Sequence, residues 1–165
     1  VTRARVADPE PVGLAALART LRDHGPGQPR LPVGSDIDDF TVCMHRPDLR
    51  SQTTAAMIAH LRPDRAPRAW VCLGNPCLGV FVPTFSDAVP DALGSEAEWL
   101  RFARLRDRVG DDPGQAAEVA AAFAAVEGDL WERADDAERS GPKALRRYAD
   151  EAWTSVDATL LALGV

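Results

Sequence analysis

Apolar residues recur at helical spacing through the second half of the chain, which predicts three helices there. Ser95 and Glu98 match a capping box that opens the first helix, and Asp112 followed by Pro113 opens the second. Ser140-Gly141-Pro142 precedes the third. Three apolar stripes need burial, namely Trp99, Phe102, Leu105 and Val109, then Val119, Phe123, Val126 and Leu130, and last Leu145, Tyr148, Ala152, Val156 and Leu160.

The N-terminal part predicts one further helix and then a loop. Asp8 or Glu10, with prolines beside them, opens a helix whose leucines at 14, 17 and 21 share one face, and Gly25 ends it. Residues 25–34, GPGQPRLPVG, hold three prolines and three glycines, so neither a helix nor a ladder of strands is expected.

The middle of the chain changes to short apolar, β-prone runs, which predict antiparallel strands. The expected strands are Phe40 to His45, Thr53 to Leu61, Ala69 to Leu73 and Gly79 to Val82, with a turn at Gly74-Asn75-Pro76. Thr53 to Leu61 has mixed propensity, and we assign it to a strand because its neighbours are strands.

These patterns predict an α+β fold with one antiparallel sheet of about four strands between Phe40 and Phe85. An N-terminal helix and three C-terminal helices pack on it. The 165 residues form a single domain by length, in which residues 1–34 are helix plus loop, 35–90 sheet and 91–165 helices.

Composition and charge narrow the classes of function. An apolar share of 45% with 27% charged residues is typical of a globular protein, and a net charge of -6 disfavours nucleic acid as a partner. No apolar stretch approaches membrane-spanning length and no leader opens the chain, so we expect a soluble, cytoplasmic protein. Three cysteines without a CxxC pair predict reduced thiols rather than a disulfide framework or a structural zinc site.

The candidates for chemistry lie in the strand block. Cys43 and His45, two residues apart on a predicted strand, would share a face and could form a thiol–imidazole pair. A small buried cysteine beside a histidine without a catalytic role fits the same pattern. Cys72 is expected in the core. Asn75 and Cys77, at the Gly-Asn-Pro-Cys corner, are the candidates for contact with a substrate.

Two further side-chain clusters have simpler explanations. His24, His45 and His60 lack metal-ligand spacing. His45 and His60 could nevertheless become neighbours across two strands and form a metal site with Cys43 or with the acidic residues at 36, 38 and 39. We therefore predict neither a metal nor a cofactor. Arg62, Arg65 and Arg68 are suited to a carboxylate or a phosphate, or form a solvated hairpin tip.

The strand block also resembles a known family. The order FTVCMH, TTAAMIAHLRPD and LGNPCLGVFVPTF, over residues 40–85, is similar to the late part of secernin-like and dipeptidase-type cysteine hydrolases of the N-terminal-nucleophile class. The resemblance implies stacked antiparallel sheets between helical layers and hydrolysis of amide bonds in peptides or other small amides. It also implies a nucleophilic cysteine at the mature N-terminus, whereas the first residue here is Val1.

By this resemblance the chain is a C-terminal segment of an amidohydrolase, inactive alone, whose partner is the missing N-terminal segment. Cys77 matches the family's corner, which implies a structural role. Two alternatives remain open. One is a self-contained thiol hydrolase that uses Cys43 and His45. The other is a non-enzymatic α/β interaction module that forms a homodimer. None of these three hypotheses involves nucleic acid or a membrane as a partner.

Overall fold

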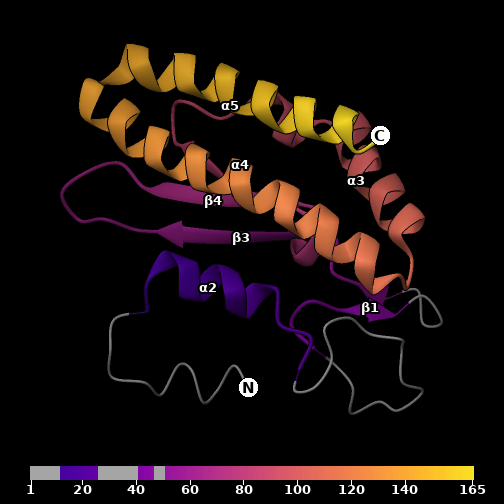
Figure 1. The fold of residues 1–165 in the computed structure, drawn as a ribbon. Coiled ribbons are helices and arrows are strands. Elements are labelled where there is room, and N and C mark those ends of the chain that lie inside the picture. Colours follow the sequence, from indigo (N-terminus) through magenta and orange to yellow (C-terminus); the bar gives the residue numbers. More distant parts are fainter. Residues whose placement is uncertain (1–11, 26–40, 47–50) are drawn as a thin grey trace.

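The computed structural model describes residues 12–25, 41–46 and 51–165, and Figure 1 shows their arrangement. Among these residues a short helix, α2 (Leu14–Leu21), is followed by five short strands and then by three longer helices. The α+β class is confirmed, and so is the general order of a helix, then strands, then three helices, whereas the main sheet has three strands rather than about four. The predicted opening of α2 at residues 8–11 lies outside the described residues.

The sheet has three antiparallel strands in the order β3 (Ala55–His60), β4 (Arg68–Leu73) and β5 (Val82–Phe85). The assignment of residues 53–61 to a strand is therefore confirmed over β3, which pairs with β4 along its whole length. The strand expected to begin at Gly79 starts only at Val82. Pro83 consequently lies inside β5, where it is tolerated because β5 is an edge strand of this sheet.

The prediction of a strand from Phe40 to His45 was wrong. Phe40 lies outside the described residues, and within residues 41–46 only β1 (His45–Arg46) has strand geometry. This strand pairs with β2 (Ser51–Gln52) in a separate two-stranded ladder and not with the main sheet. Just upstream, Thr53 N donates to the carbonyl of Met44 at 2.9 Å, and the Thr53 hydroxyl adds two bonds: Oγ1 accepts from Met44 N at 3.0 Å and donates to the carbonyl of Val42 at 3.1 Å.

The three C-terminal helices form where the apolar stripes predict them. They are α3 (Glu96–Val109), α4 (Pro113–Ser140) and α5 (Pro142–Ala162). The Ser95 hydroxyl accepts from Glu98 N, as in the predicted capping box, and the Asp112 carboxylate accepts from the amides of the first turn of α4. Gly141, with a φ of 97°, makes the sharp reversal between α4 and α5.

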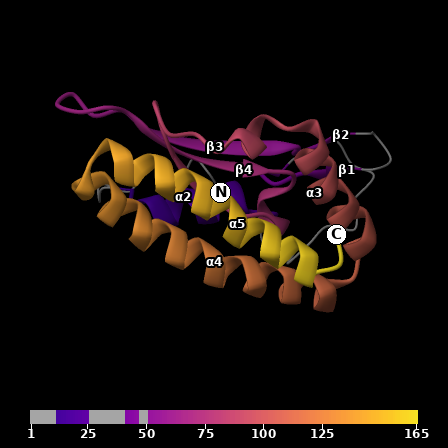
Figure 2. The same cartoon turned by 90° about the horizontal axis from the view of Figure 1, so that it is seen from above.

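Helices α2, α4 and α5 all lie on one side of the sheet, as Figure 2 shows. The larger core joins α3, α4 and α5 to β5, and Leu105, Leu130 and Leu160 are fully buried in it. A smaller core lies between α2 and strands β3 and β4, around Ile58, Trp70 and Cys72, which confirms the expected burial of Cys72.

The opposite face of β3 is open. Met57 is 63% exposed there, and Leu61 just beyond the strand is 79% exposed. In the part of the chain that the structure describes, no helix is long and apolar enough to cross a membrane.

Candidate metal centre

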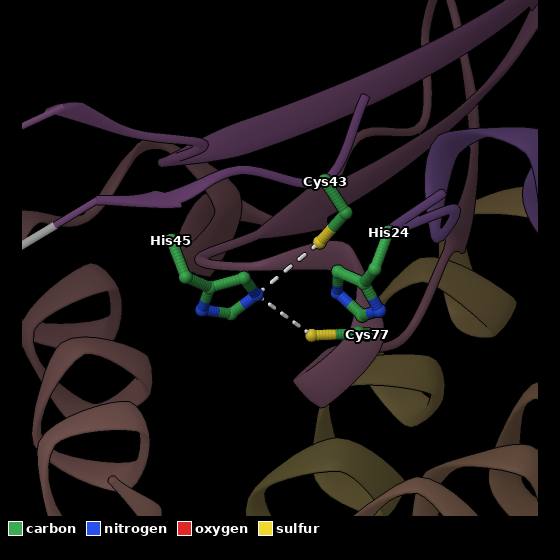
Figure 3. A group of neighbouring side chains, drawn as sticks. All are labelled: His24, Cys43, His45 and Cys77. Atoms are coloured by element: carbon green, nitrogen blue, oxygen red, sulfur yellow. Dashed lines mark hydrogen bonds between the residues drawn. The ribbon is translucent and has the colours of Figure 1, made fainter. Parts of the chain in front are cut away.

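Four potential metal ligands meet at one end of the sheet. His24, Cys43, His45 and Cys77 each offer one nitrogen or sulfur atom, and these four atoms all lie within 4.8 Å of one another. Figure 3 shows the two thiols and the two imidazole rings converging on a common point. The sequence predicted the contact between Cys43 and His45 but not the two residues that complete the group.

Three separate segments deliver these side chains. His24 follows the last turn of α2, while Cys43 and His45 come from the segment that leads into β1. Cys77 lies in η2 (Pro76–Leu78), a single 3-10 turn between β4 and β5. A backbone hydrogen bond from Cys43 N to the carbonyl of Asp23, 3.0 Å long, holds the first two segments side by side.

Local packing places the turn that carries Cys77. Pro76 opens this turn and is buried. Gly79 closes it, at a point where any side chain would collide, because a Cβ there would lie 2.5 Å from Cys72 Sγ and 3.0 Å from the carbonyl of Leu73. The Asn75 side chain is buried and donates to the carbonyl of Met44 at 3.5 Å. Asn75, a candidate for substrate contact, therefore ties the turn to the neighbouring segment.

The distances within the cluster suit a tetrahedral ion. His45 Nε2 lies 3.5 Å from Cys43 Sγ and 3.1 Å from Cys77 Sγ. Typical Zn–S and Zn–N bonds of about 2.3 and 2.0 Å place neighbouring sulfur and nitrogen ligands about 3.5 Å apart in a tetrahedron. Small side-chain movements therefore bring the ligands to coordination distance.

His24 supplies a second indication of a ligand. Its side chain is buried, and Nε2 has no hydrogen-bond partner among the described residues. Its ring lies 5.2 Å from the ring of His45, between ring centres. A buried nitrogen without a partner is costly, whereas coordination to a metal would satisfy it.

The two thiols of the cluster differ in acidity. The hydrogen bond from the Cys43 thiol holds the pKa of Cys77 well below its usual range, and His24 and His45 act in the same direction against the opposing effect of burial. The pKa of Cys43 is raised in turn, first by its hydrogen bond with Cys77 and then by burial. The hydrogen-bonded pair thus favours a thiolate on Cys77 and a neutral thiol on Cys43.

The other predicted candidates lie elsewhere. His60 does not join the cluster, since it pairs with Arg68 at the far end of β3. The acidic residues at 36, 38 and 39 lie outside the described residues. Arg62 and Arg68 are already paired with acids of α4, Arg62 with Glu138 at 2.6 Å and Arg68 with Asp135. Arg62 and Arg68, on either side of the turn between β3 and β4, thus face α4.

The ligand set was missed for a definable reason. Only Cys43 and His45 are close in sequence, while His24 and Cys77 come from segments on either side, without the repeated short spacing that marks zinc motifs. The Cys-x-His pair was the one local signal.

No protein-family model, curated protein sequence or solved structure matches this chain.

Proposed function

We propose that this protein binds a zinc ion through His24, Cys43, His45 and Cys77, and that the ion stabilises the docking of the N-terminal segments on the sheet. The observation that carries the proposal is the convergence of four ligand atoms within 4.8 Å. Thiolate and imidazole together suit zinc, and two sulfurs with two nitrogens are typical of tetrahedral zinc sites.

The number of ligands favours a structural role over a catalytic one. Four protein ligands close a tetrahedral site, whereas catalytic zinc keeps one position for water or substrate. Here the ion would join the end of α2, the strand β1 and the turn η2. Binding would also displace the proton that Cys43 carries, because thiols coordinate zinc as thiolates.

Metal titration of the full chain tests this function. We expect one equivalent of Zn2+ to bind, and Co2+ in its place to give the intense visible absorption of a tetrahedral site with sulfur ligands. Cys77→Ser and His24→Ala should each abolish stoichiometric binding. His60→Ala is the matched control, because His60 is exposed and outside the cluster, and it should bind as the wild type does. Absence of binding by the wild type would refute the proposal.

A second candidate uses the same side chains without a metal. The 3.1 Å contact between His45 Nε2 and Cys77 Sγ, with the lowered pKa of Cys77, favours a thiolate–imidazole pair. In this proposal Cys77 attacks the carbonyl carbon of a small amide and forms a thioester. His45, which has taken up the proton of the Cys77 thiol, gives it to the departing amine, and water then hydrolyses the thioester to release the carboxylic acid and the Cys77 thiol. This activity agrees with the amide hydrolysis implied by the family resemblance of residues 40–85.

The geometry favours Cys77 over Cys43 as the nucleophile. Cys43 is fully buried and its pKa is raised, while Cys77 is half-buried. After removal of metal by a chelator, iodoacetamide at neutral pH should label Cys77 faster than a model thiol, and His45→Ala should slow that labelling. Labelling of Cys77 no faster than the model thiol would eliminate the thiol candidate. Protection of Cys77 by added Zn2+ would favour the metal centre.

A further inference from the structure

One arginine connects two of the segments that supply the cluster. Arg22 lies at the C-terminal end of α2, two residues before His24. Its Nε donates to the carbonyl of Pro76 at 2.9 Å, and its Nη2 donates to the carbonyl of Gly79 at 3.3 Å. These two carbonyls flank the turn that carries Cys77. Arg22 therefore binds both ends of that turn from the segment that also carries His24.

A buried carboxylate on α4 fixes this arginine. Glu127 accepts from Arg22 with both oxygens, at 3.0 Å from Nη1 and 2.6 Å from Nη2. The second oxygen also accepts from Phe81 N at 2.7 Å. Bidentate pairing of this kind fixes the orientation of a guanidinium group as well as its position. The Glu127 side chain is only 9% exposed, so water does not replace these contacts easily.

We propose that Arg22 and Glu127 are positioning residues for the metal centre, which set the place of Cys77 relative to His24 through the carbonyls of Pro76 and Gly79. The inference rests on the proposed zinc site. Neither residue supplies a ligand atom to the cluster of His24, Cys43, His45 and Cys77. They act by holding two ligand-bearing segments at the separation that the ion requires before it binds.

The expected size of the effect follows from other metal sites. Side chains that orient ligands typically change metal affinity by 10–100-fold when they are mutated. Glu127→Gln keeps the shape of the side chain and removes its charge and one acceptor. Arg22→Lys keeps the positive charge. A lysine ammonium group, however, lacks the planar, forked set of donors with which the arginine binds two carbonyls and a carboxylate at once.

The experiment measures Co2+ and Zn2+ affinity of the full chain by competition with a chromophoric chelator. We expect Glu127→Gln and Arg22→Lys to bind 10–100-fold more weakly than the wild type. The visible spectrum at saturating Co2+ should also change, because displaced ligands alter the geometry around the ion. A merely structural role would lower the stability of the metal-free protein and leave that spectrum unchanged.

Asp157→Asn provides a matched control. Asp157 pairs with Arg101 through another partly buried ion pair, between α3 and α5 and outside the cluster. This variant should bind Co2+ as the wild type does, with the same spectrum. Circular dichroism of the metal-free proteins verifies folding. If Glu127→Gln does not fold, Arg22→Lys carries the test, because the Arg22 side chain is 26% exposed and the change keeps its charge.

The outcomes separate the two proposals. If the wild type binds no Co2+, the zinc site itself is wrong. If the wild type binds Co2+ and the folded variants bind it with equal affinity and an identical spectrum, the zinc site stands and the positioning role is refuted. Equal loss of affinity in Asp157→Asn would also refute it, since general destabilisation would then explain the effect.

Discussion

Helix α4 presents carboxylates to two ends of the same sheet, and the carboxylate near the ligand cluster is the more buried. Near the ligand cluster, Glu127 is 9% exposed and binds Arg22 together with a backbone amide. Near the turn between β3 and β4, Glu138 is 23% exposed and binds Arg62, while Asp135 binds Arg68 with its own side chain 56% exposed. The first network joins separate segments around a candidate site, and the second closes a hairpin onto a helix.

The difference shows why an ion pair must be judged by its surroundings. Water reaches the carboxylates of Asp135 and Glu138 more readily than that of Glu127, although Arg68 is buried as well. A buried charge or amide that loses its partner pays for its desolvation. The two ends should therefore respond differently to equivalent substitutions, and the following predictions run from the largest expected effect to the smallest.

Glu127→Ala should destabilise the protein most. The change leaves Arg22 without its carboxylate and Phe81 N without an acceptor. Breaking a buried ion pair costs about 3–5 kcal/mol, and we expect the lower end, because Arg22 itself is partly exposed. Urea unfolding at neutral pH measures the change. A loss no larger than that of a substitution at Glu138 would remove the distinction between the two ends.

Gly79→Ala should be the next most damaging change. The new Cβ would lie 2.5 Å from Cys72 Sγ, and overpacking of this kind costs about 1–3 kcal/mol. Gly128→Ala in the middle of α4 is the control, because nothing lies within 4 Å of a Cβ there. That variant should gain about 0.5–1 kcal/mol from helix propensity. Thermal unfolding should therefore show shifts of opposite sign.

Trp131→Phe tests the stretch of α4 between the two ends. Trp131 Nε1 donates to the carbonyl of Phe81 at 2.9 Å, and phenylalanine keeps the aromatic packing but removes this donor. The loss of one such bond is worth about 1 kcal/mol. Chemical denaturation with an unchanged denaturant slope is the expected result. A change below the measurement error would show that water replaces the indole at that carbonyl.

Glu138→Gln should have the smallest effect, about 1 kcal/mol or less. Arg62 lowers the pKa of Glu138, so this carboxylate stabilises the fold above its unfolded pKa, and that stabilisation is lost as the pH falls through its folded pKa. The difference between variant and wild type should thus be present at neutral pH and disappear in acid. A difference that persists at low pH would contradict this origin.

The sequence predicted most of the fold because its signals are local. The apolar stripes and the capping residues Ser95 and Asp112 suffice to indicate α3 and α4, and β-prone runs indicate β3 and β4. The predicted strand before His45 failed because propensity ignores pairing. There the backbone bonds to the Thr53 side chain and to Asp23 rather than to a neighbouring strand of the sheet.

The sequence by itself determined the fold class, the four described helices, the core position of Cys72 and the closeness of Cys43 to His45. Each depends on residues near one another in the chain. Only the tertiary structure decided that His24 and Cys77 join that pair, and that Arg22 meets Glu127 far along the chain. Such contacts depend on how α2 docks on the sheet, and that docking depends on burial and hydrogen bonds among distant segments, which no local pattern encodes.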